Sequence, residues 1–190
     1  TFVVVGGGFA GVETISELED MARVAVERNE RLSVSDLHFV MVEAAPRIMP
    51  EVPADRAEKV VAELRARGIE ILLNTSLSDA TDGNLQLINM ADKSPAGEIK
   101  TDTLIWTAGV AASPMLKNTD FPIDERGRVR VSADLRVTGD DGVVEGAWAA
   151  GDNAAVPDLS GGGVGGFCVP NAQHASRQAV VLAKNLLAAR

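Results

Sequence analysis

The stretch VVVGGGFAGVE, residues 3–13, decides the fold of this chain. A short apolar run leads into the pattern G-x-G-x-x-G and then into an amphipathic segment. A glycine turn between a buried strand and a helix is typical of dinucleotide-binding units, because it lets a pyrophosphate approach the helix N-terminus. We therefore expect this turn to bind a nucleotide, the alternative being a turn with no ligand. The residues concerned are Gly6, Gly7, Gly8, Phe9, Ala10 and Gly11.

The rest of the first half predicts an α/β fold. Apolar runs at residues 1–5, 37–42, 69–73 and 101–109 predict buried strands, and apolar stripes over residues 11–28 and 55–67 predict helices, the second ending at Gly68. This alternation favours a Rossmann-like parallel sheet flanked by helices, with right-handed crossovers. Turn signals at Asp82-Gly83 and at Pro95-Ala96-Gly97 divide residues 75–100 into a three-stranded antiparallel meander.

The second half contains fewer elements. Short strands are predicted at residues 129–132 and 135–137, and GAWAAGD at residues 146–152 is predicted to be a buried strand. A glycine-rich loop follows at residues 160–166, and then a helix after Pro170 with Asn171 as its N-cap. Because small units bury too little surface to offset chain entropy, we expect these elements not to close a core of their own.

Two acidic residues follow the glycine turn. Glu43 ends the second strand, where a carboxylate accepts hydrogen bonds from the adenosine ribose and repels a 2′-phosphate, so NAD is favoured over NADP. A surface acid is the alternative, and Arg47 keeps NADP open because an arginine could accept that phosphate. Glu13 is placed in the first helical turn, where it either favours the helix dipole or carries a proton in redox chemistry.

Composition narrows the classes of function. The net charge of -9 argues against nucleic-acid binding. One cysteine, Cys168, and two histidines, His38 and His174, leave no basis for a metal site or a redox cysteine pair. No apolar run approaches the roughly 20 residues that span a bilayer. With no secretion signal visible, a cytoplasmic location is expected.

Four motifs in order resemble the two-dinucleotide-fold flavoproteins of the pyridine nucleotide-disulfide oxidoreductase superfamily. VVVGGGFAGVE resembles the NAD turn, MVEAAPRIMP its acidic strand end, LIWTAGV the Ala-Gly crossover at Ala108 and Gly109, and GAWAAGD the FAD ribityl motif. GDNAAVPD followed by PNAQHASRQA resembles type II NADH dehydrogenases, which are NADH:quinone oxidoreductases.

The resemblance implies a domain organisation and an activity. Residues 1–112 would be an NAD(H)-binding domain, and residues 113–190 the C-terminal part of an incomplete FAD-binding domain. The complete enzyme would pass electrons from NADH to FAD and then to quinone, and this segment alone would be inactive. Alternatives are a soluble FAD/NAD(P)H-dependent reductase of a disulfide or iron–sulfur partner, and a stand-alone NAD-binding module. A homodimer is compatible with this interpretation, and any membrane contact would be peripheral and made by parts outside this chain.

The resemblance also implies roles for individual residues. Gly151 and Asp152 would bind the FAD ribityl chain, and Ala172, Gln173 and Gln178 would border the flavin and the quinone pocket. Glu13 and Gln173 would be catalytic. His174 is expected to pack or to cap the helix.

Overall fold

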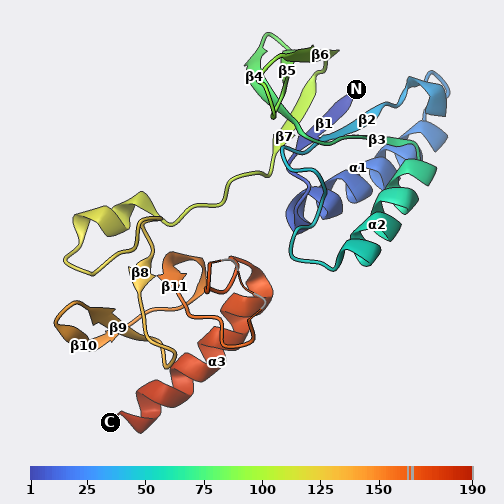
Figure 1. Cartoon of the computed structure of the whole chain (residues 1–190). Helices are drawn as coiled ribbons and strands as arrows, with labels where there is room; N and C mark the ends of the chain where they lie inside the picture. The colour runs from blue at the N-terminus through green and yellow to red at the C-terminus, as the bar shows by residue number, and fades with distance from the viewer. Residues whose placement is uncertain (162, 164, 190) are drawn as a thin grey trace. The chain divides into compact units, whose positions relative to one another are not determined.

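The computed structural model describes residues 1–161, 163 and 165–189. These residues form two compact units, Thr1–Gly109 and Val110–Arg190 (Figure 1). Part of the predicted glycine-rich loop, at positions 162 and 164, lies outside the described residues.

A parallel sheet forms the centre of the first unit, as the sequence predicts. Its strands are β1 (Phe2–Val5), β2 (Phe39–Val42), β3 (Ile69–Leu72) and β7 (Thr103–Trp106), in the order β3-β2-β1-β7. Val5 pairs with Val42 on one side and with Trp106 on the other, so three strands end at the same level. This register brings the segments that follow β1, β2 and β7 to one edge of the sheet.

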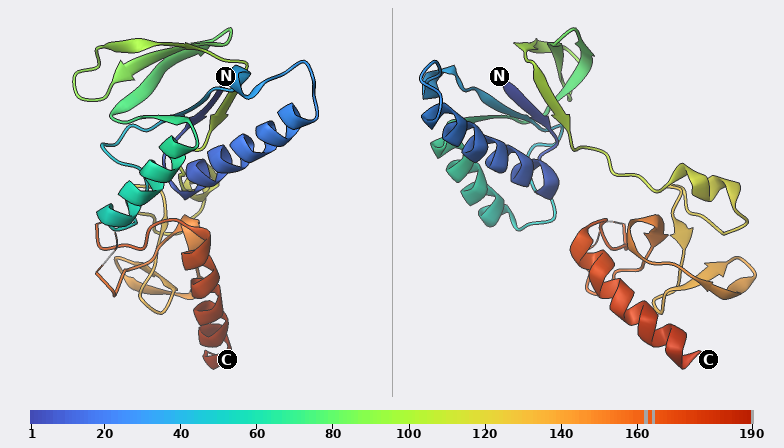
Figure 2. Two further views of the ribbon diagram at one scale, coloured as in Figure 1. Left: turned by 90° about the vertical axis from the view of Figure 1, so that its right-hand side faces the viewer. Right: turned by 180° about the vertical axis from the view of Figure 1, so that it is seen from behind.

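Helices α1 (Phe9–Glu27) and α2 (Ala54–Ala66) cover one face of this sheet (Figures 1 and 2). Ile15 and Leu64 are buried against Val4 and Met41 of the strands, as the apolar stripes predict. Helix α1 begins two residues earlier than predicted, so that Gly11 lies inside it. Gly68, with φ +86°, follows the C-cap of α2 as expected. A short 3-10 helix, η1 (Val34–Asp36), precedes β2.

A buried carboxylate joins α1 to the end of α2. Glu19 is 1% exposed and accepts hydrogen bonds from Arg23 and Arg67. Arg67 also donates to the Ser16 carbonyl over 2.9 Å. Burial alone would raise the pKa of Glu19, but the hydrogen bonds from Arg67 and Arg23 outweigh it and hold this pKa below its ordinary value of 4.5. The group is therefore ionised at neutral pH, and the pair with Arg67 fixes α1 to the end of α2.

The antiparallel meander covers the other face (Figure 2). It consists of β4 (Thr75–Thr81), β5 (Asn84–Asn89) and β6 (Pro95–Lys100), and Leu85 and Leu87 pack against Val3 and Val40 of the sheet. The predicted turn at Asp82-Gly83 is confirmed by its position between β4 and β5.

The second predicted turn of the meander, at Pro95-Ala96-Gly97, is wrong. These residues lie in β6, and the chain reverses over residues 90–94. There the Asn89 side chain accepts from the Ala91 N–H and Asp92 from the Ser94 N–H, which are local turns of the Asx type. Proline and glycine mark instead the irregular pairing of β6 with β5, where Gly97 has φ +119°.

The second unit buries a small core of its own, contrary to expectation. Its strands are β8 (Val129–Arg130), β9 (Arg136–Gly139), β10 (Gly142–Trp148) and β11 (Ala154–Ala155), with 3-10 helices η2 (Pro114–Asn118) and η3 (Gly151–Asn153) and helix α3 (Ala172–Ala188). The buried side chains come from β8, β9, β11 and the loops beside them. They are Val129, Val131, Leu135, Val137, Ala154 and Val156. Among the helices of the described residues, none is both long and apolar enough to cross a membrane.

The predicted buried strand at residues 146–152 is also wrong. Strand β10 ends at Trp148 and, among the described residues, pairs with β9 alone. Within the predicted stretch, Gly146 and Asp152 are exposed and residues 147–151 are half-buried. Residues 151–153 form η3, and the buried strand that follows is β11, two residues long. An apolar run does not by itself distinguish a central strand from an edge strand, because the difference lies in the number of neighbours.

Candidate functional site

Two glycines of the turn between β1 and α1 are required by packing. A Cβ on Gly11 would lie 1.7 Å from the Gly6 carbonyl oxygen, because α1 passes directly over the end of β1. A Cβ on Gly6 would lie 2.8 Å from Thr107 Oγ1 and 2.9 Å from the Ala108 nitrogen, and Gly6 has φ +109°. These two positions therefore shape the turn whether or not a ligand is present.

Gly8 differs from both. Apart from Gly8 itself and its two neighbours in the chain, no described residue has an atom within 4 Å of the position that a Cβ on Gly8 would take. The φ of -74° at Gly8 would suit any residue. Gly8 is the N-cap of α1, where no side chain caps the helix and no acidic residue stands in the first turn. Phe9 and Ala10 are exposed. An open, uncapped helix N-terminus presents free N–H groups and partial positive charge, which suits an anion such as a diphosphate.

Glu43 is brought directly to this turn. One carboxylate oxygen accepts the Gly7 N–H over 2.5 Å, and the other accepts the Ala45 N–H over 2.6 Å. The side chain is half-buried. Each carboxylate oxygen has a second lone pair, so Glu43 can shape the turn and still accept a hydroxyl from a ligand.

Arg47 is engaged by backbone carbonyls. Its guanidinium donates to Met49 over 3.2 Å, to Val52 over 2.8 Å and to Pro50 over 2.6 Å. These bonds direct the positive charge into the loop after β2. The pattern APRIMP, an arginine between two prolines, is the one feature of the sequence that could have indicated an ordered loop here.

The segment after β7 closes the other side of the turn. Thr107 Oγ1 donates to the Val5 carbonyl over 2.9 Å, and Ala108 lies against Gly6. Trp106 is 58% exposed and donates its indole N–H to the Ala108 carbonyl over 2.8 Å. The structure thus brings Ala108 to the glycine turn, and sequence reasoning missed the role of Thr107.

Glu13 lies two residues further from the start of α1 than predicted. Because the helix begins at Phe9, its first turn contains no acidic residue, and Glu13 is exposed in the second turn. A favourable interaction with the helix dipole falls off within the first turn, so that explanation of Glu13 loses its basis.

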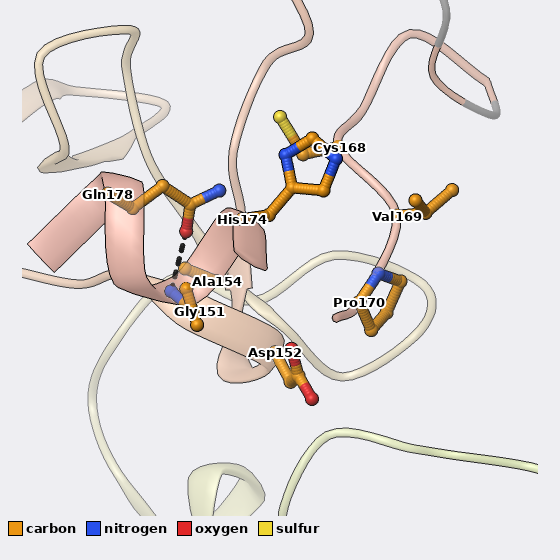
Figure 3. A pocket seen from close by; sticks show the side chains of 9 residues that line it. Gly151, Asp152, Ala154, Cys168, Val169, Pro170, His174 and Gln178 are labelled. Atoms are coloured by element: carbon orange, nitrogen blue, oxygen red, sulfur yellow. Dashed lines mark hydrogen bonds between the residues drawn. The ribbon is translucent and has the colours of Figure 1, made fainter. Parts of the chain in front are cut away.

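The predicted residues of the second unit gather around the start of α3 (Figure 3). The Gln178 amide oxygen accepts the Gly151 N–H over 2.7 Å, which fixes η3 against α3. The N-cap is confirmed, since the Asn171 side chain accepts the His174 N–H over 2.7 Å. A small hollow there is lined by Cys168, His174 and Gln178 among others, and Asp152 is exposed, pointing away from the imidazole. Ala172 and Gln173 are exposed.

Comparison with known proteins identifies relatives over nearly the whole chain. The family model described as pyridine nucleotide-disulphide oxidoreductase matches residues 1–179. The chain is 33% identical to a type II NADH:quinone oxidoreductase of Haemophilus influenzae, over 97% of this chain and 39% of that protein. It is 30% identical to a probable NADH dehydrogenase of Dictyostelium discoideum, over 97% of this chain and 37% of that protein. The chain thus spans about two fifths of the length of these relatives.

Solved structures agree on the fold. An FAD-dependent pyridine nucleotide-disulphide oxidoreductase from Desulfovibrio vulgaris has a TM-score of 0.68 and 25% identity, over 98% of this chain and 42% of that one. NDH2 from Plasmodium falciparum, solved in complex with NADH, has a TM-score of 0.69 and 21% identity, over 82% of this chain and 32% of that one.

Proposed function

Because the chain belongs to the pyridine nucleotide-disulphide oxidoreductase family, we propose that it is the NADH-binding segment of a flavin-dependent NADH dehydrogenase. The observation that carries this proposal is the open, uncapped N-terminus of α1 at Gly8, beside the Glu43 carboxylate. We assign residues 1–112 to the NAD(H)-binding domain and residues 113–190 to part of an FAD-binding domain. The names of the relatives with at least 30% identity support the activity of an NADH dehydrogenase.

The dinucleotide's diphosphate would lie at the start of α1. The Gly7 N–H is already donated to Glu43, so the donors to the phosphates would be the N–H groups of the residues after it, Gly8 to Ala10. Gly7 then has a shaping role. The helix dipole adds its positive end at the same place, and the space at Gly8 lets the phosphate come close to the backbone.

Two features support NADH over NADPH. The Glu43 carboxylate would accept a ribose hydroxyl and repel a 2′-phosphate, and it is held in place by two backbone N–H groups. The nearest candidate for a phosphate ligand, Arg47, donates instead to carbonyl groups of its own loop. The charge that a 2′-phosphate requires is therefore directed elsewhere.

We expect this chain to bind NADH more tightly than NADPH, and Glu43→Ala to reduce that preference by about 1.5–3 kcal/mol, the value of a charged hydrogen bond. Calorimetric titration with NADH and with NADPH measures the two affinities and so the preference. Because Glu43 also holds Gly7, the ratio of the two affinities is the informative quantity. The matched control is Glu51→Ala, which removes an exposed acid from the same loop and should leave the ratio unchanged. Equal affinity of the unaltered chain for both nucleotides would contradict the assignment of Glu43.

The second unit would supply residues of the FAD-binding site. Asp152 on η3 would accept hydrogen bonds from the hydroxyls of the ribityl chain, and Gln178 holds the neighbouring Gly151 in position. When bound, FAD would accept a hydride from NADH and pass electrons on. The residues of this chain supply binding and orientation. Quinone as the acceptor rests on the name of the Haemophilus influenzae relative.

Gln173 is the proposed donor to a quinone carbonyl. It is exposed in the first turn of α3, where its amide is not needed to cap the helix because Asn171 does so. In the complete enzyme, Gln173→Ala should slow quinone reduction by about tenfold, the value of roughly one hydrogen bond, and should leave flavin reduction by NADH unchanged. Stopped-flow absorbance separates the two half-reactions. An equal loss in both would mean that Gln173 is structural.

A further inference from the structure

The loop after β2 holds Gly7, the residue between Gly6 and Gly8, through both its N–H and its carbonyl group. The Gly7 N–H donates to Glu43 over 2.5 Å, and the Met49 N–H donates to the Gly7 carbonyl over 2.7 Å. The Ile48 side chain fills the third side, 2.6 Å from the position of a Cβ on Gly7. Gly7 is buried among these contacts. The turn therefore cannot shift unless residues 43–49 shift with it.

Met49 makes its bond to Gly7 from an unfavourable backbone conformation. Its φ is +48°, in the left-handed region that side chains other than glycine rarely adopt. Such a conformation is strained and persists only where the surroundings impose it. Met49 is buried, with 9% of its surface exposed. Burial of the side chain does not fix the peptide groups, so a further restraint on the backbone is required.

The Val52 N–H donates to the Met49 carbonyl over 3.0 Å, and Arg47 adds a second restraint that extends to the rest of the loop. Its guanidinium donates to the carbonyls of Met49, Pro50 and Val52, over 3.2, 2.6 and 2.8 Å. A planar group with several fixed donors can hold several carbonyls at once, which a lysine ammonium does less well. The contacts thus run without a gap from Arg47 to Met49 and from Met49 to Gly7, at the start of the anion-binding turn.

We propose that Arg47 is a positioning residue for the diphosphate-binding turn. By holding Met49, it keeps the Met49 N–H on the Gly7 carbonyl and so fixes the N–H groups of Gly8 to Ala10 before a ligand arrives. The proposal rests on the dinucleotide site proposed above and names what orders that site. In this proposal Arg47 orders the turn and does not bind a 2′-phosphate.

The two roles of Arg47 differ in a measurable way. A positioning residue affects every ligand that uses the turn, so its loss should weaken NADH, NADPH and ADP by the same factor. A phosphate ligand affects NADPH alone. ADP is the informative probe, because it carries the diphosphate but neither the nicotinamide nor a 2′-phosphate.

The test uses the whole chain and calorimetric titration. Arg47→Met keeps the aliphatic stem and should raise the Kd of NADH and of ADP by the same factor, about fivefold to tenfold, the equivalent of roughly one backbone hydrogen bond. Arg47→Lys should recover part of this loss. The matched control is Arg56→Met, which makes the same charge change at an exposed position of α2 and should have no effect.

Hydrogen exchange measured by NMR gives a readout that general destabilisation would not produce. In Arg47→Met, the Met49 amide should exchange faster by at least about tenfold, while the amides of β5 in the meander should exchange as before. Selective loss of NADPH affinity would overturn the proposal, and so would unchanged affinity for NADH and ADP. If Arg47→Met does not fold, Arg47→Lys decides by the same two measurements.

Failure of the proposed function gives a different result. If the unaltered chain binds neither NADH nor ADP, the dinucleotide site is wrong, and exchange at the Met49 amide still decides whether Arg47 orders the turn. If the unaltered chain binds both and the Arg47 variants bind equally well, the site stands and the positioning role is wrong.

Discussion

Gly11→Ala is expected to destabilise the first unit by at least about 4 kcal/mol, which is an exceptional cost for one methyl group. The added Cβ would lie 1.7 Å from the Gly6 carbonyl oxygen and 2.9 Å from Thr107 Oγ1. In an ordinary helix interior the same change stabilises by about 1 kcal/mol, because alanine is the better helix former. Gly11 is inside α1, so helix propensity and packing predict opposite signs.

Packing should win because neither side of the contact is free to move. On one side, Ile15 and Glu19 of α1 are buried, and the Arg67 pairs hold the helix to the end of α2. On the other side, Thr107 donates to the Val5 carbonyl and Met49 to the Gly7 carbonyl. Relief of the overlap therefore requires the helix to leave the sheet.

Urea unfolding followed by circular dichroism and by Trp106 fluorescence, in a Trp148→Phe background, measures this loss. Trp106 belongs to the first unit and Trp148 to the second, so the background assigns the signal to the unit that contains the change. A free energy of unfolding that differs from that of the parent by less than about 1 kcal/mol would show that α1 can withdraw from β1. Packing would then not require glycine at this position.

Local sequence signals predicted the parts of the fold that depend on local chemistry. Gly68 ends α2 because a left-handed residue is needed after the C-cap, and Asn171 caps α3 because its short side chain reaches the His174 N–H. The parallel sheet followed from continuous apolar strands alternating with amphipathic helices. Each of these depends on residues within one or two turns of the chain.

The sequence predictions that are wrong concern how many strands pair with a given segment. GAWAAGD is apolar, yet none of its residues is fully buried, and among the described residues β10 pairs with β9 alone. Pro95 and Gly97 predict a turn by their residue types, but in β6 they mark irregular pairing with β5. The chain reverses instead at residues 90–94, where the side chains of Asn89 and Asp92 accept local backbone N–H groups. Pairing partners are set by the tertiary fold, which single-sequence patterns do not contain.

The candidate site was predictable only in part. The glycine pattern and the strand-end acid indicated Gly8 and Glu43, and the structure places both at one turn. The role of Arg47 could not be deduced, because an arginine near the acid has the same sequence signature whether it faces a phosphate or three carbonyls. Only the direction of its guanidinium distinguishes these cases.

The three glycines of the motif differ in their surroundings: Gly6 and Gly11 are crowded by the protein, and Gly8 is open. The substitution Gly8→Ala therefore tests ligand binding with little effect on packing. Apart from its two neighbours in the chain, no described residue lies within 4 Å of a Cβ at Gly8, and its φ of -74° and ψ of -176° suit alanine. The cost to folding should be about 1 kcal/mol at most, which is the usual difference between glycine and alanine at an N-cap. A ligand whose phosphates approach the backbone there would meet the new methyl group.

We expect Gly8→Ala to raise the Kd of NADH and of ADP by about 100-fold, or ~2.7 kcal/mol, because it obstructs charge-assisted bonds from the helix N-terminus. Adenosine carries the ribose but no phosphate, and it should lose little. The comparison is made by calorimetry on chains shown by urea unfolding to be equally stable. Affinity for NADH equal to that of the parent, in a folded Gly8→Ala chain, would remove the diphosphate from this turn. An equal loss of affinity for adenosine would show that the methyl group displaces Glu43 and does not act on the phosphates. Adenosine has no phosphate, and it would contact the Glu43 carboxylate through its ribose.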